Sequence, residues 1–137
     1  MKKIILSIII LLNVNLFAYQ HNTGFISIDD FEDLSIKTNG VRINNFSLAE
    51  TKSWMAKGLV NIVVTFSAKN KNGVNKHFSA MFIGLDKDNN VIWALNAEPI
   101  MATISKNKTE SINSDSYVQP GTLSKTVKVM TIINGDI

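Results

Sequence analysis

Apolar and polar side chains alternate with period two over the eleven residues from Leu59 to Lys69. One side of this pattern carries Val60, Ile62, Val64, Phe66 and Ala68. Because β-branched and aromatic side chains at alternate positions are typical of a half-buried strand, the segment predicts a long strand with one buried face. An Asn-Gly turn signal ends at Gly73, and a second apolar run, Lys76–Asp86, follows it. We therefore expect these two strands to form a hairpin.

Each of these two strands is expected to contribute a phenylalanine to a core between two sheets. Phe66 lies on the apolar side of the first strand, and Phe82 lies in the second. Thr65 precedes Phe66 and is expected on the outer face, because adjacent residues of a strand point to opposite faces.

Further strands are expected wherever short apolar runs lie between turn signals. They are Phe25–Ile28, Leu34–Lys37, Val41–Phe46, Val91–Leu95, Ile100–Ile104, Glu110–Ile112 and Leu123–Ile133. The run Val91–Leu95 is expected to pair with Lys76–Asp86, and Pro120-Gly121 is expected to turn the chain before the last strand. Only Tyr19–Gly24 has the composition of a loose terminus. Seven or more short strands without a long helical period predict an all-β fold, an immunoglobulin-like antiparallel β-sandwich.

One short segment, Ser47–Lys57, fits a helix and a strand equally well. Ser47 and Glu50 have the spacing of a capping box, in which both side chains bind free amides at a helix start, and Gly58 would end the helix. Trp54, however, also suits a strand. The sequence leaves both alternatives open, so we expect a sandwich with at most one short helix.

The first eighteen residues, Met1–Ala18, have the organisation of a secretory signal peptide. Two lysines follow Met1, the run Ile4–Leu12 is almost wholly aliphatic, and the small residue Ala18 ends the stretch. A spanning helix needs about 20 apolar residues, so this run is too short to cross a membrane comfortably. We expect an exported bacterial protein, periplasmic or secreted, whose mature part is a single domain over residues 19–137 with no stable membrane anchor after cleavage.

Charge and cysteine content narrow the functional classes. The chain has fourteen basic and eleven acidic residues, and two of the basic residues lie in the expected signal peptide. The mature domain is therefore almost neutral and its lysines are scattered, whereas nucleic-acid-binding domains usually carry a strongly basic stripe. Because the chain has no cysteine, it has no thiolate nucleophile, disulfide or thiolate metal ligand. We expect neither nucleic acid nor a cofactor as a ligand.

Motifs that carry catalysis or bind metal ions are missing or incomplete. His21 and His77 are isolated and lack the spacing of a metal site. The segment Asp86–Asn90 begins like a calcium loop, but Val91 and Ala97 stand where that loop requires Gly and Glu. Nucleophile-elbow, phosphate-loop and zinc-helix motifs are absent from the sequence. We therefore expect the protein not to be an enzyme.

Two kinds of residue are candidates for binding a partner. The first is an acidic segment around Phe31, which would suit a basic surface or a cation, although such charge runs are more often solvated. Its members are Asp29, Asp30, Glu32 and Asp33. The second is tryptophan, which is enriched at binding hot spots. Trp93 lies in an apolar run and is expected in the core rather than on the surface, whereas the sequence leaves Trp54 undecided.

Three segments follow one another in an order known from exported proteins. They are Val64–Asn70, then Phe82–Asp86 continued by Asn90–Ile92, and finally Val118–Gly121. In these segments the stretch between residues 60 and 131 resembles the FxLYD-type immunoglobulin-like domains of exported bacterial proteins. Gly84 departs from the motif, which has Leu there, and Leu85 stands where the motif has Tyr. The resemblance implies a sandwich used for interaction, and that family supplies no catalytic residues.

These observations favour a non-catalytic, exported protein-binding or assembly module whose partner is another protein. The alternative is a small secreted inhibitor or immunity-type protein, in which the acidic segment blocks the basic active site of a cell-wall hydrolase or toxin. A weaker alternative is a hydrolytic or carbohydrate-binding enzyme accessory that stacks sugars on Trp54 or Trp93.

Overall fold

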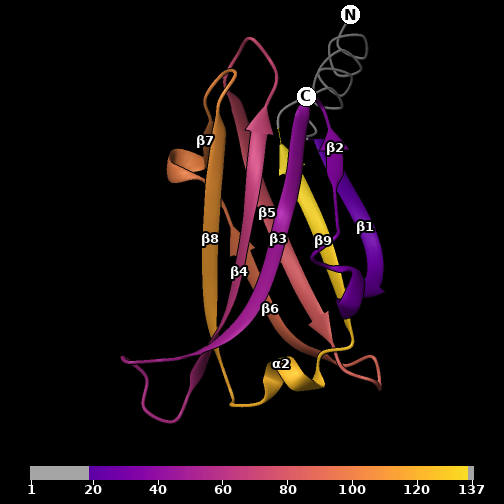
Figure 1. Cartoon of the computed structure of the whole chain (residues 1–137), viewed down its shortest axis with the longest axis vertical. Helices are drawn as coiled ribbons and strands as arrows, with labels where there is room; N and C mark the ends of the chain where they lie inside the picture. Colours follow the sequence, from indigo (N-terminus) through magenta and orange to yellow (C-terminus); the bar gives the residue numbers. More distant parts are fainter. Residues whose placement is uncertain (1–18, 136–137) are drawn as a thin grey trace, which may run out of the picture.

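The computed structural model describes residues 19–135 as two antiparallel β-sheets packed on each other (Figure 1). The expected signal peptide, residues 1–18, lies outside the described residues, as do residues 136–137. The first sheet has the order β1 (Tyr19–Ser27), β9 (Lys128–Gly135), β5 (Lys76–Leu85) and β6 (Val91–Ala97), and the short β7 (Thr103–Ile104) also pairs with β5. The second sheet has the order β2 (Ile36–Thr38), β3 (Val41–Lys52), β4 (Val60–Asn70) and β8 (Thr109–Val118). Two 3-10 turns, η1 (Ile28–Asp30) and η2 (Ile100–Ala102), and the short helix α2 (Thr122–Lys125) complete the described chain.

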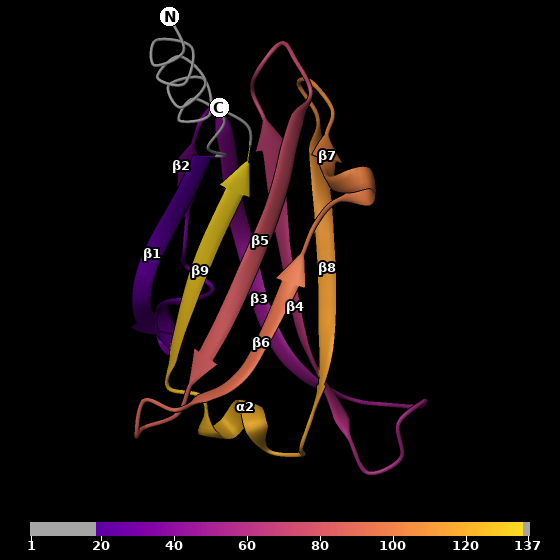
Figure 2. The same cartoon turned by 180° about the vertical axis from the view of Figure 1, so that it is seen from behind.

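This arrangement confirms the all-β antiparallel sandwich that the sequence predicts. In the first sheet the last strand, β9, lies between β1 and β5, and in the second sheet β2, β3 and β4 form a meander (Figure 2). Immunoglobulin constant domains instead set strands A-B-E-D against C-F-G. The likeness to that fold therefore lies in the architecture and not in the order of the strands.

The core between the sheets is built around phenylalanine, as the alternation predicts. Phe66 of β4 and Phe82 of β5 are both fully buried, and their ring centroids lie 5.5 Å apart. Phe46 stacks on Phe66 at 5.6 Å, and Phe31 meets Phe82 edge-on at 6.0 Å. Aromatic pairs at such distances add to the stabilisation from burial itself. The strand register that places Phe66 inward is therefore confirmed.

The expected hairpin between β4 and β5 is wrong, because the two strands lie in different sheets. Asn70, at the end of β4, is fully buried, and its side-chain amide donates to the carbonyl of Val74 at 2.8 Å and to that of Ile104 at 3.0 Å. Its Oδ1 accepts from the backbone amide of Asn72 at 2.9 Å. This buried amide fixes the connection as it crosses from one sheet to the other. The second expected hairpin, β5 with β6, is confirmed by the pairing of Phe82 with Leu95.

The helical alternative for Ser47–Lys57 is also wrong, because β3 continues to Lys52. A bulge interrupts the pairing of β3 with β4 after Asn44, and Asn45 adopts a positive φ of 56° within it. An extra residue in a strand shifts the alternation of inward side chains by one position. The buried positions before and after the bulge, Ile43 and Phe46, therefore do not follow period two.

Glu50 caps a helix, but not the one that its own sequence suggests. Its two carboxylate oxygens accept from the backbone amides of Gly121 at 2.9 Å and Leu123 at 3.0 Å, at the start of α2. The expected strand Leu123–Ile133 therefore begins only at Lys128, because its first residues form this helical turn. The amide hydrogen bonds, from Gly121 first and Leu123 second, lower the pKa of Glu50.

The segment Tyr19–Gly24 is not a loose terminus but the first part of β1, paired with β9. The sequence pattern does not reveal this part of the strand because a bulge interrupts it. The register shifts between Asn22 and Phe25, and Gly24 takes a positive φ of 68°. The backbone amide of Thr131 donates to the Thr23 hydroxyl at 3.0 Å, so a side chain replaces the missing ladder bond.

We predict that Phe66→Ala lowers the free energy of unfolding by about 3–5 kcal/mol, through lost burial and the cavity that remains. The matched variant Thr65→Ala should cost within about 1 kcal/mol, because Thr65 gives up only an exposed hydrogen bond from Asn113. Urea denaturation of both variants measures the contrast. Equal losses for the two neighbours would contradict the register of β4.

A second prediction concerns pH. Because the folded state lowers the pKa of Glu50, its charged carboxylate stabilises the fold above the ordinary glutamate pKa of about 4.3. This contribution should be lost as the pH falls through the lower folded value. The melting-temperature difference between the wild type and Glu50→Gln should therefore be largest near neutral pH and shrink toward pH 3. A difference that stays constant with pH would show that the charge on Glu50 does not support α2.

Candidate functional site

The four predicted acidic residues stay on the surface of one segment, between β1 and β2. Asp29 and Asp30 belong to η1, Glu32 and Asp33 follow it, and all four are exposed. Phe31 is fully buried among them and packs 5.3 Å from the ring of Phe46. Over residues 19–135, no three or more His, Asp or Glu side chains come together in a way that could hold a metal ion. The inhibitor hypothesis for this segment stays a prediction.

Trp93 is buried in the core, as the sequence predicts. Its side chain is only 4% exposed, and its indole Nε1 donates to the hydroxyl of Thr126 at 2.9 Å. A buried tryptophan with a satisfied N–H is a packing residue that also ties β6 to the segment after α2. Trp93 therefore presents no surface to a partner.

Gly84 is required by the same tryptophan. A Cβ built on Gly84 would overlap the indole of Trp93, which lies directly across the β5–β6 pair. This contact gives a physical reason for the glycine at this position. The indole of Trp93 on β6 fills the space that a side chain at position 84 of β5 would occupy.

Trp54 is the opposite case, since it is 91% exposed at the tip of the connection between β3 and β4. We call residues 53–58 the Trp54 loop. Its neighbour Met55 is 69% exposed, while the Ser53 hydroxyl accepts from the Ala56 amide at 2.9 Å and holds the turn. Figures 1 and 2 show this loop leaning outward past β8 at one end of the sandwich. Exposed apolar side chains that lie next to each other are candidates for contact with a partner.

A second exposed apolar pair lies on a bulge that the sequence does not reveal. The pairing of β6 with β5 stops at Ala97, and β7 resumes it at Thr103, so residues 98–102 are pushed out of the sheet edge. Met101 has a positive φ of 58°, and Ile100 and Met101 are 89% and 88% exposed. We call residues 98–102 the η2 bulge. The expected strand Ile100–Ile104 is therefore wrong except for its last two residues.

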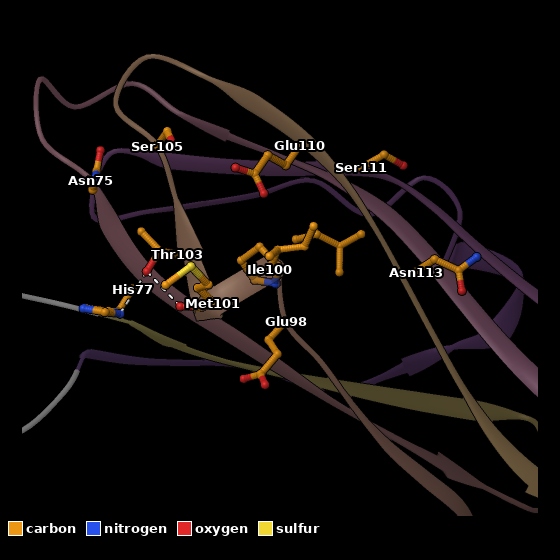
Figure 3. A pocket seen from close by; sticks show the side chains of 12 residues that line it. Asn75, His77, Glu98, Ile100, Met101, Thr103, Ser105, Glu110, Ser111 and Asn113 are labelled. Carbon is orange, nitrogen blue, oxygen red and sulfur yellow. Dashed lines mark hydrogen bonds between the residues drawn. The ribbon is translucent and has the colours of Figure 1, made fainter.

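The η2 bulge and β8 enclose a groove of about 920 Å³ (Figure 3). The sandwich is closed further along, where the Ser114 hydroxyl donates to the carbonyl of Asn96. Pro99 and Ile112 are buried and supply apolar surface, and the acidic side chains are Glu98 on the bulge and Glu110 on β8. No lysine or arginine lines this groove, so its charge is negative.

Sequence reasoning missed the groove because its two walls come from segments with weak patterns. Met101 and Ala102 both have left-handed backbone, and these residue types do not predict it, because glycine and asparagine adopt that conformation far more readily. The one available signal was Pro99, which cannot donate to a strand ladder and therefore interrupts an edge strand.

Comparison of the chain with protein-family models, with curated proteins and with solved structures found no match. Within residues 19–135 there is no helix with the length and hydrophobicity to cross a membrane. The resemblance to FxLYD-type domains stays a prediction.

We predict that Gly84→Ala destabilises the fold by about 1–3 kcal/mol or more, because the added methyl group forces the indole of Trp93 to move. Gly73→Ala is the matched control, since a Cβ there meets no atom within 4 Å. In a Trp93→Leu background the cost of Gly84→Ala should fall. An undiminished cost in that background, measured by chemical denaturation, would show that Trp93 does not impose the glycine.

Proposed function

We propose that this chain is a non-catalytic, exported protein-binding module whose contact residues are Trp54 and Met55. The observation that supports this function best is the exposure of both side chains, 91% for Trp54 and 69% for Met55, on a loop whose turn is held by the hydrogen bond from Ala56 to Ser53. Tryptophan dominates binding hot spots, and methionine adapts to irregular apolar surfaces. A loop whose turn is already formed loses less conformational entropy on binding than an unstructured one, which favours affinity.

Export forms part of the same proposal. It is supported by the positive start, the short apolar run and the small residue at Ala18, which together have the order of a signal peptide. The absence of catalytic motifs in the sequence supports a binding role over an enzymatic one. The partner is a folded protein in the same compartment.

The test is capture of a partner by the chain, expressed from its full sequence with an affinity tag, from the envelope fraction of its own bacterium. We predict that the double variant Trp54→Ser/Met55→Ser loses at least about tenfold of the captured partner, as expected for a hot spot. Val74→Ser is the matched control, because Val74 is also an exposed loop residue, 59% accessible, but lies outside the Trp54 loop. Equal capture by all three proteins, or no capture by any, would contradict the proposal.

A further inference from the structure

The free edge of β8 has an apolar protrusion at each end. β8 pairs with β4 and, within residues 19–135, forms no backbone ladder on its other side, where β6 reaches it through the hydrogen bond from the Ser114 hydroxyl to Asn96. The Trp54 loop lies beyond the Val118 end, and the η2 bulge lies toward the Thr109 end (Figures 1 and 2). Both protrude on the same side of the molecule. A strand of ten residues spans about 33 Å, so within one chain the two protrusions are far apart.

The loop at one end and the groove at the other carry opposite charges. Lys52 and Lys57 flank Trp54, and no acidic residue lies between Thr51 and Leu59. The groove beside the η2 bulge contributes Glu98 and Glu110 and no basic residue other than a histidine. Opposite charges on two surfaces favour their encounter and fix their orientation.

The groove also has the size and lining for the side chain that the loop presents. Its volume of about 920 Å³ exceeds that of a tryptophan side chain, and buried Ile112 and Pro99 offer apolar contact. The exposed side chains of Ile100 and Met101 stand at its rim, where they would cover an inserted indole. Carboxylate and carbonyl oxygens nearby are acceptors that suit an indole N–H.

We propose that the partner of the Trp54 loop is a second copy of this chain, joined in a two-fold dimer across the two β8 edges. Turning a second copy by 180° sets its β8 antiparallel to the first, so that each Trp54 loop reaches the groove of the other copy. Such an interface is self-complementary and closed, which is the commonest form of protein oligomer. This inference rests on the proposed function, because it names the partner of the same loop.

Cysteine cross-linking tests the geometry directly, since the natural chain has no cysteine. In the double variant Met55→Cys/Ser111→Cys, one cysteine lies on the loop and the other on the groove wall. A disulfide needs Cα atoms within about 7 Å, so these positions can be joined only between two chains. With an added thiol oxidant such as diamide, we predict a covalent dimer as the main product. The control Met55→Cys/Lys37→Cys, with its second cysteine on β2 at the far edge of the same sheet, should give little dimer.

The other outcomes overturn the two-fold dimer. A ladder of larger covalent products would indicate head-to-tail chains, and equal cross-linking by the control would indicate random collision. A protein that sediments as a monomer at concentrations up to about 200 µM would exclude the dimer altogether.

Charge reversal provides a second test that does not depend on oxidation. We predict that Glu98→Lys/Glu110→Lys raises the dimer dissociation constant at least about tenfold in sedimentation experiments. Adding Lys52→Glu and Lys57→Glu to the same chain should restore most of the affinity. Failure of this restoration, in a chain that keeps its β-sheet circular dichroism, would contradict the loop-to-groove contact.

The two proposals fail in different ways. A monomer that still captures another protein through Trp54 would overturn the dimer and leave the proposed function standing. A monomer that captures nothing would overturn both.

Discussion

The contact between Phe66 and Phe82 across the two sheets is the constraint on which the rest of the structure depends. Each sheet is one layer, and neither can bury an apolar face without the other. The rings of Phe31 and Phe46 extend the cluster, and Phe46 reaches it only because the bulge at Asn45 turns β3 by one residue. Burial of these rings fixes which face of each strand points inward. The loops and edges are then free to vary, and they carry the candidate surfaces.

Single polar side chains determine where the chain leaves the sheets. Asn70 binds carbonyl groups of two other segments and directs the crossing from β4 to β5. Glu50 holds the first turn of α2 although 71 residues separate it from Gly121. Thr126 receives the indole N–H of Trp93 and in turn donates to the carbonyl of Thr122. Buried or half-buried groups of this kind stabilise a fold because their partners would otherwise be left without hydrogen bonds.

The sequence predicted the elements that depend on local alternation and missed those that depend on distant contacts. Period two located the long strands β4 and β5 and placed Phe66 and Phe82 in the core, because burial of one face acts on every second residue. The apolar run around Trp93 likewise predicted its burial. It could not show that β4 and β5 lie in different sheets, since the contacts at the crossing, such as that of Asn70 with Ile104, join residues far apart in the sequence. The sequence predicted only part of β1 and of β3, because the bulge in each strand shifts the alternation within the pattern.

The sequence predicted less of the candidate site than of the fold. Exposure of Trp54 could not be read from its neighbours, because the same residues suit a helix, a strand or a loop tip. The groove requires β6 to leave β5 after Ala97 and β8 to lie opposite, and the two walls meet only in the folded chain. The acidic segment was visible in the sequence, yet its side chains face solvent around one buried ring.

An exposed strand edge normally invites uncontrolled pairing, and proteins blunt it with charge, bulges or cover. In this molecule β8 is long and regular, but its outer residues other than Tyr117 are polar and include Asp115, while the η2 bulge stands beside its first half. These features restrict pairing without preventing it, because a partner must match the bulge as well as the edge. A copy of the same chain meets that requirement through its own loop and with the complementary charge. The irregular backbone at Met101 thus converts a generic strand edge into a surface that distinguishes one partner from others.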